Sequence, residues 1–351
     1  MLVYWSMFAV PALSSLLAGG RVREQARNFA LLGFILIIFT FLIGLRFEVG
    51  GDWFSYEYNV LTTRYERLSY TLSYGDPAFG LLSWVSVRIG LGAQGPTFVC
   101  GALFIWGLWR FLREQNEPWL ALTAGVPYLV IVVGMGYVRQ AAAIGLILLA
   151  LVSLGRGSLK GVLLWTVTAS LFHATALFML PLLVVAHARR NLAATIPLAI
   201  FGAGLFGAIL APRLDAFVEG YVEAEMGSSG ALIRLAMNAV PALLFVLFRK
   251  RFDLDSRLRL FWFLVSAISL LLLALVFVFP SSTVLDRLGL YLIPIQLFVF
   301  GNLVPVVARK PEGRWLVRYA IVAYYAAVLY TWLNYAVHSE YWLPYRTILL
   351  Q

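Results

Sequence analysis

The chain has 351 residues, of which 62% are hydrophobic and 13% are charged, and its mean hydropathy is +0.86. Soluble domains carry roughly 25% charged residues, so this composition excludes a soluble fold and predicts an all-α polytopic integral membrane protein. The net charge of +10 is divided among short loops rather than gathered on one polar surface, which argues against nucleic-acid binding.

Ten apolar runs follow one another along the chain, each of roughly the length that crosses ~30 Å of hydrocarbon as a helix. They lie near residues 3–19, 29–45, 95–110, 118–135, 138–154, 191–211, 231–248, 259–279, 286–307 and 316–337. The first run lacks the basic flank and cleavage site of a signal peptide, so we expect it to be retained as a span. The runs predict a single transmembrane domain over residues 1–351, with about 10–12 transmembrane helices that include re-entrant or interfacial segments.

Two further segments do not fit a single crossing. Residues 78–93 are amphipathic and contain several glycines, which is typical of an interfacial or re-entrant segment. Residues 161–187 are too long for one straight span and too short for two. If the loops that hold 18 of the 27 lysines and arginines all face the cytoplasm, residues 161–187 must enter and return, with a turn near Phe172-His173. The same orientation makes 46–77 and 212–230 periplasmic loops.

This orientation also places one set of polar residues at or just within the outer membrane face. The set consists of Arg46, Asp52, Arg139, His173, Arg234, Asp286, Arg287 and Arg346. Ionisable residues are costly inside a membrane and are usually functional there. We therefore expect them to define a site that opens outward.

The stretch from Arg46 to Tyr56 follows directly on an apolar run. Gly50 and Gly51 permit a tight turn that brings backbone N–H groups close to a bound anion. Asp52 is a candidate acceptor for the proton of a sugar hydroxyl, and Tyr56 offers a flat surface to a sugar ring. The alternative is an interfacial aromatic belt with one snorkelling arginine.

Two more candidates interrupt the apolar runs in the middle of the chain. Arg139 and Gln140 open a helix in a stretch with no other charge, so we expect them to contact substrate. The alternative for Arg139 is a salt bridge to an acid of an outer loop. His173 is either a catalytic base or a hydrogen-bonded structural residue, and Thr175 is placed to orient it.

The remaining candidates lie in the C-terminal half. Arg234 follows a Gly-Ser-Ser-Gly turn at the start of one run, and Arg346 lies near the end of the chain. Asp286, Arg287 and Tyr291 open another outward-facing helix. Asp286 either joins the site or simply neutralises its neighbour Arg287.

Several arginines and few lysines around one cavity suit a diphosphate, because guanidinium groups stay charged and bind phosphate oxygens in pairs. No outward-facing group of acids has the spacing of a divalent-metal site, and the single cysteine, Cys100, excludes a cysteine-based one. The sequence has no P-loop, no Rossmann glycine pattern and no nucleophile elbow. We therefore expect neither a metal nor another cofactor.

Four short motifs resemble, in their order and membrane setting, the signature of the EpsG-type branch of the Wzy polysaccharide polymerases. They are Arg46…Gly50-Gly51-Asp52…Tyr56, Arg139-Gln140 before an alanine-rich helix, Phe172-His173-Ala-Thr, and Asp286-Arg287…Tyr291. Together they span residues 46–291. The chain departs from the pattern at Gly51, where relatives more usually carry threonine, and this departure weakens any role for a hydroxyl there.

The resemblance implies a helical, GT-C-like fold in a bacterial inner (plasma) membrane, and polymerisation of O-antigen or exopolysaccharide repeat units at its outer face. Donor and acceptor are then glycans linked to undecaprenyl diphosphate, used without nucleotide or metal. Membrane lipids and a chain-length regulator are the other partners we consider. We expect an inverting displacement of the diphosphate, with His173 or Asp52 as the base. The arginines expected to stabilise the leaving charge are Arg46, Arg139, Arg234 and Arg287.

Three alternative functions stay open at this point. A related O-antigen ligase moves the glycan to lipid A core, and a dominant periplasmic loop would favour it. A lipid-linked oligosaccharide flippase binds and releases its cargo without forming bonds, and internal repeats would favour it. A membrane O-acyltransferase also uses a histidine and arginines in a helical bundle.

Overall fold

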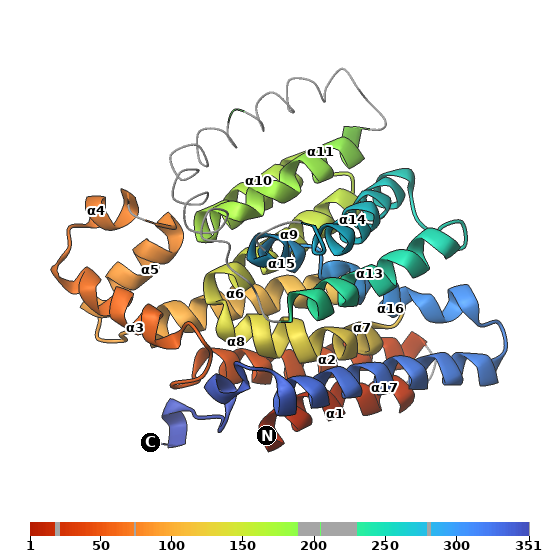
Figure 1. Ribbon diagram of the computed structural model, residues 1–351, viewed down its shortest axis with the longest axis horizontal. Coiled ribbons are helices and arrows are strands. Elements are labelled where there is room, and N and C mark those ends of the chain that lie inside the picture. The colour runs from red at the N-terminus through yellow and green to blue at the C-terminus, as the bar shows by residue number, and fades with distance from the viewer. Residues whose placement is uncertain (18–21, 74, 189–203, 205–229, 279–281, 351) are drawn as a thin grey trace.

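The computed structural model describes residues 1–17, 22–73, 75–188, 204, 230–278 and 282–350. Its long helices run side by side along one axis (Figure 1). Three short helices lie together at one end, α3 (Trp53–Thr62), α4 (Leu68–Ser73) and α5 (Pro77–Arg88). We call this end of the bundle the α3 end.

Six helical stretches of the described chain are long and apolar enough to cross a membrane. They are α6 (Gln94–Leu112), the continuous stretch Pro118–Gly136, α9 (Val138–Gly155), α13 (Ala231–Phe248), α14 (Ser256–Leu275) and α17 (Pro311–Tyr335). The stretch Pro118–Gly136 consists of α7 (Pro118–Gly125), the π-helix η2 (Val126–Val133) and α8 (Gly134–Gly136). The predicted class is confirmed, because the chain is an all-α polytopic membrane protein.

Shorter apolar helices accompany these six. They are α1 (Leu2–Leu17), the apolar part of α2 (Val22–Gly44), α10 (Leu159–Phe172), and the 3₁₀-helix η3 (Ala174–Phe178) with α11 (Met179–Ala188). Single 3₁₀ turns η1 (Thr63–Tyr65), η5 (Ser339–Trp342) and η6 (Ile348–Leu350) complete the described elements. The predicted span 191–211 and most of the predicted loop 212–230 lie outside the described residues.

The run 286–307, which we predicted as one of the spans, is broken. It forms α15 (Ser282–Leu290) and α16 (Pro294–Val307), which meet at an angle of 52°. Pro294 has no backbone N–H, and its ring excludes a continuous helix through the preceding turn, so the helix restarts at this residue. The break turns α15, which carries Asp286 and Arg287, away from the axis of α16.

The two ambiguous segments also take definite forms. Helix α10 ends at Phe172, and His173 has an extended backbone (φ −158°, ψ 112°), so the chain breaks at the predicted residues. Helix α5 has only 12 residues and rises roughly 18 Å, too little to cross a membrane, as predicted for residues 78–93. The sides of the membrane that the two ends of the bundle face stay a prediction.

Helix α9 is the central helix of the bundle, and almost all its side chains are buried. It packs backbone to backbone on α6, because a Cβ added to Gly107 would lie 1.9 Å from the carbonyl oxygen of Gly145. Small residues at such contacts let membrane helices approach closely. The start of α9, where Arg139 lies, is therefore held on a rigid element.

Candidate active site

The loop between α2 and α3 is fixed by one glycine. Gly50 has φ +105°, and a Cβ there would lie 2.4 Å from the carbonyl oxygen of Met135, so no other residue fits without a shift. Its N–H donates to the carbonyl of Tyr341 at 2.8 Å. The Gly50 N–H is therefore bonded within the protein, and an anion contact of the Gly50-Gly51 turn stays a prediction. Gly51 is exposed and a Cβ there would meet only the Trp342 ring, at 3.9 Å, so a threonine would fit.

Arg46 is fully buried and folds back on its own loop. Its Nε donates to the carbonyl of Val49 at 2.9 Å and its Nη1 to that of Ile43 at 2.5 Å. Its guanidinium lies 5.5 Å from the Trp53 ring centre. Burial lowers the pKa of Arg46 to about 10, so it stays charged at neutral pH. In this structure the Arg46 guanidinium is enclosed and holds the turn together, and its contact with substrate stays a prediction.

Arg346 plays a related part from the other end of the chain. Its guanidinium pairs with Glu48, and its carbonyl accepts from the N–H of Phe47 at 3.0 Å. The neighbouring Thr347 forms a β-bridge with Arg46. The C-terminal segment thus fastens the loop that leads to Asp52, while the role of Arg346 in substrate binding stays a prediction.

Asp52 and Tyr56 begin α3 and lie one turn apart. The Tyr56 hydroxyl donates to Asp52 Oδ2 at 3.4 Å, and its buried ring packs on Phe79 with ring centres 5.5 Å apart. Burial raises the pKa of the Asp52 carboxyl, and the positive charges of Arg287 and Arg139 oppose that rise. Asp52 therefore lies within the field of two arginines that are distant in sequence.

Arg139 forms an ion pair that the sequence did not identify. Its Nη1 donates to Asp76 Oδ2 at 2.9 Å, and its guanidinium lies 5.7 Å from the ring centres of both Tyr56 and Phe79. Asp76 Oδ1 accepts from the N–H of Ala174 at 3.3 Å. The alternative that we weighed for Arg139, a salt bridge to an outer-loop acid, is thus what the structure shows. The Arg139 side chain is still 38% exposed, so one face of it is accessible.

Asp76 joins three segments of the chain, and it is the main residue that sequence reasoning missed. It is 7% exposed and occupies the N-cap position of α5, but its side chain makes no capping hydrogen bond. It reaches instead to the start of α9 and to the break after α10. The available signal was the Gly75-Asp76-Pro77 sequence, an acid directly before a proline at a helix start.

The break at His173 is placed against the start of α16. The His173 and Tyr291 rings lie 6.5 Å apart, centre to centre. Thr175 was expected to orient His173, but its hydroxyl donates to that of Tyr291 at 3.2 Å. His173 and Tyr291 are thus neighbours, while Asp76 binds the backbone one residue further on.

Arg234 and Asp286 form a bidentate pair between α13 and α15, with N···O distances of 2.7 and 2.8 Å. The two Asp286 oxygens thus bind Arg234, and the alternative that Asp286 neutralises Arg287 stays open. The Arg287 guanidinium lies 4.6 Å from the ring centre of Tyr137. Gln140 Nε2 donates to the Arg287 carbonyl at 3.3 Å, which fixes the end of α15 to the start of α9.

A buried amide network supports the broken helix from behind. Asn238 Nδ2 donates to the carbonyl of Gly289 at 2.8 Å, and Asn238 Oδ1 accepts from Gln296 Nε2 at 2.7 Å. Tyr325 donates to Gln296 Oε1 at 2.8 Å. The sequence signal was two amide side chains inside apolar runs, which usually hydrogen-bond between membrane helices.

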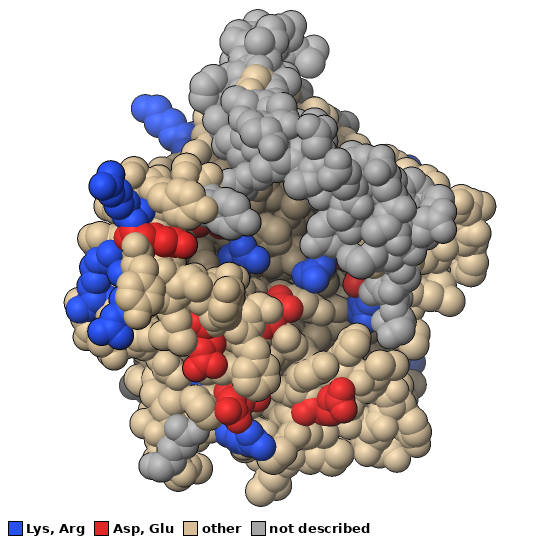
Figure 2. All heavy atoms as spheres, turned by 60° about the vertical axis from the view of Figure 1, so that its left-hand side comes forward, with Lys and Arg blue, Asp and Glu red and all other residues tan. Residues whose placement is uncertain are grey.

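The structure therefore brings three predicted arginines to the α3 end, and we call Arg139, Arg234 and Arg287 the arginine cluster. Tyr137 lies beside this cluster, since its ring centre is 4.6 Å from the Arg287 guanidinium. On this face, basic and acidic side chains gather around a hollow (Figure 2). Within the described residues, no three His, Cys, Asp or Glu side chains gather as metal ligands. The arrangement offers positive charge beside a carboxylate with a raised pKa.

The model of the EpsG family matches residues 29–347, which is nearly the whole chain. No curated protein and no solved structure matches the chain.

Proposed function

Since the chain belongs to the EpsG family of EpsG/Wzy-type polysaccharide polymerases, we propose that it polymerises undecaprenyl-diphosphate-linked repeat units into O-antigen or exopolysaccharide. The reaction takes place at the periplasmic face of the bacterial inner membrane and needs neither metal nor nucleotide. The observation that carries the proposal is the geometry around Tyr56, whose hydroxyl donates to Asp52 Oδ2 at 3.4 Å and whose ring centre lies 5.7 Å from the Arg139 guanidinium. A base and a binding site for an anionic leaving group are thereby combined.

The donor is the growing glycan on its lipid diphosphate. A hydroxyl oxygen of the acceptor attacks the anomeric carbon, and the bond from that carbon to the diphosphate oxygen breaks with inversion. The electron pair leaves on the diphosphate, so the developing charge is negative. Arg139 and Arg287 stabilise that charge in a water-poor site, where preorganised donors are most effective.

We assign Arg234 and Asp286 to positioning, because they bind each other through two hydrogen bonds of 2.7 and 2.8 Å. Their pair joins α13 to α15, and Gln140 joins α15 to α9. Arg287 is thereby held beside the start of α9, with its guanidinium 4.6 Å from the ring centre of Tyr137. Tyr56 and Tyr291 lie at the same end, but both rings are buried, so we assign them to holding Asp52 and His173 in place rather than to sugar contact.

The acceptor proton goes to Asp52, with His173 as the second candidate. Burial favours the protonated form of Asp52, while the two arginines favour the ionised one. A diphosphate bound at Arg139 and Arg287 cancels that opposing charge, so donor binding makes Asp52 more basic. His173 lies next to Tyr291, with ring centres 6.5 Å apart, and the N–H of the following residue binds Asp76, the partner of Arg139.

The test is a reaction of the purified full chain with a lipid-linked repeat unit, without nucleotide or metal, resolved on a gel. We expect a ladder of longer glycans. Arg139→Ala should lower the rate by about 10²–10³, as for the loss of one preorganised donor. Arg156→Ala, which removes an exposed arginine paired with Glu114, is the matched control and should keep the ladder. Transport of the same lipid across proteoliposomes without any ladder would identify a flippase instead.

A further inference from the structure

A second hollow lies at the end of the bundle opposite the α3 end, where α16 joins α17 (Figure 1). It is lined by residues 305–310, by the first turns of α17 and by Arg251 from the loop after α13, and its volume is about 790 Å³. We call it the basic hollow. None of the residues discussed for the candidate active site lines it.

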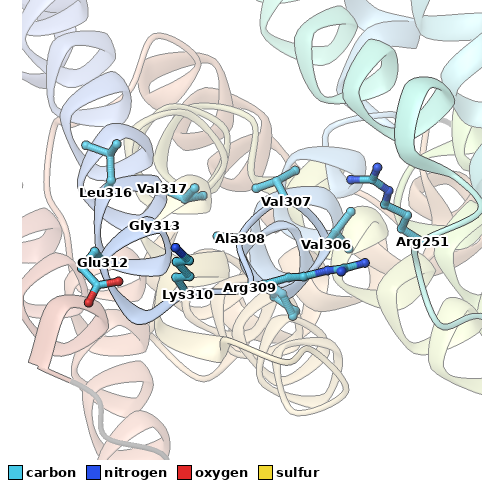
Figure 3. Close-up of a pocket in the computed structure, with 11 residues that line it drawn as sticks. Arg251, Val306, Val307, Ala308, Arg309, Lys310, Glu312, Gly313, Leu316 and Val317 are labelled. Atoms are coloured by element: carbon cyan, nitrogen blue, oxygen red, sulfur yellow. The ribbon is translucent and has the colours of Figure 1, made fainter.

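Three cations face this hollow from two separate segments. Arg309 and Lys310 come from the turn between α16 and α17, and Arg251 enters from the other side (Figure 3). Glu312 is the one acid among the lining residues, and it lies on the far side from Arg251. The lining therefore carries a net charge of about +2 at neutral pH.

Three arginines at the same end of the bundle, unlike these cations, pair with carboxylates. Arg156 pairs with Glu114, Arg257 with Asp255, and Arg318 with Glu117, all at 2.7–2.9 Å. Among the described residues, by contrast, neither Arg251 nor Arg309 nor Lys310 has a carboxylate within 4.0 Å. The Arg251 guanidinium packs on the Phe248 ring, 5.4 Å from its centre.

The walls of the basic hollow are apolar and exposed. Val307 is 36% exposed and Leu316, on the first turns of α17, is 62% exposed. Only 22% of the apolar 18-residue stretch of α17 is buried within the protein, so most of this helix faces lipid. Cations at a helix end above such a surface lie at the depth of lipid headgroups.

From this arrangement we propose that the basic hollow binds the phosphate headgroup of an anionic phospholipid, whose acyl chains lie along α17. A lipid with a net negative charge neutralises these three cations better than a zwitterionic lipid does. The acyl chains of the anionic lipid would cover Val307 and Leu316. Basic pockets between membrane helices recognise anionic headgroups through this combination of charge and apolar contact. The site is independent of the proposed polymerase activity.

The test is a titration of the detergent-purified full chain with phosphatidylglycerol, with bound lipid counted by native mass spectrometry. Each cation near an anionic headgroup contributes about fivefold in affinity, so Arg309→Ala/Lys310→Ala should weaken binding about 25-fold. The control variant Arg156→Ala/Lys160→Ala removes the same charge from exposed positions at the same end of the bundle. It should change the affinity for phosphatidylglycerol less than about twofold. Arg251→Gln, on a different segment, should weaken phosphatidylglycerol binding about fivefold.

Three outcomes would overturn the proposal. Equal weakening in both double variants would mean that only the overall surface charge matters. Phosphatidylcholine bound as tightly as phosphatidylglycerol would reduce the site to an apolar contact. Displacement of phosphatidylglycerol by an equal concentration of inorganic phosphate would assign the hollow to a free anion rather than a lipid.

Discussion

Replacing Asp76 by asparagine removes the charge that holds Arg139 but keeps an oxygen that can accept from the Ala174 N–H. The Asp76 carboxylate is 6% exposed and the Arg139 side chain 38%, so solvent screens part of the pair. A hydrogen bond to a charged group contributes about 1.5–3 kcal/mol, and the screening favours the lower half of this range. A loss of about 1.5–2 kcal/mol from the transition state lowers the rate about 10–30-fold.

The assay is the initial rate of glycan ladder formation for Asp76→Asn, Arg139→Ala and the double variant. Because Asp76 acts through Arg139, the double variant should be no slower than Arg139→Ala alone. Glu114→Gln breaks an exposed pair with Arg156 of almost the same length, 2.8 Å, and should keep the rate within about twofold. Wild-type activity in Asp76→Asn, or independent multiplication of the two effects, would refute the reasoning.

Three further predictions concern the surrounding residues. Since burial raises the pKa of Asp52, the rate should fall as pH is lowered through that raised pKa, and Asp52→Asn should remove this limb of the pH–rate profile; an unchanged limb would assign the proton to another group. Gly50→Ala should destabilise the protein by about 1–3 kcal/mol in thermal unfolding, since its Cβ meets the Met135 carbonyl, whereas Gly51→Thr should change stability by less than about 0.5 kcal/mol; equal effects would contradict the account of the turn. Arg234→Ala should slow polymerisation, and Arg234→Lys should restore little of it because lysine lacks the fork that binds both Asp286 oxygens; full rescue by lysine would show that charge alone is needed.

Much of the fold was predictable because hydrophobicity over about 20 residues is a local property. The break at His173 also followed from the sequence, since the placement of basic loops required a turn there. The bend before Pro294 was missed although the proline is visible, because prolines inside apolar runs are often tolerated in membrane helices. Its effect depends on the neighbouring helices, which supply Asn238 and Gln140 to the carbonyls around it.

The candidate site was predicted as a set of residue types but not as a set of contacts. Arg139 was chosen for its isolation in an apolar stretch, yet its partner Asp76 lies 63 residues away, which no local pattern specifies. Arg46 was predicted to lie in the outward-opening site because it follows directly on an apolar run. Only the packing of the loop on Met135 and Tyr341 shows that it is enclosed. Pairing and burial are tertiary properties. The sequence therefore identified these arginines as candidates, but it could not distinguish the enclosed Arg46 from the partly exposed Arg139.

The most direct test of the central claim is to count the undecaprenyl diphosphate released for each glycosidic bond formed by the purified chain. The proposed displacement predicts one released lipid diphosphate per bond, with both products lost together in Arg139→Ala. Release without chain growth would show hydrolysis, and chain growth without release would show another donor. Either result would contradict the assignment of the arginine cluster to the leaving diphosphate.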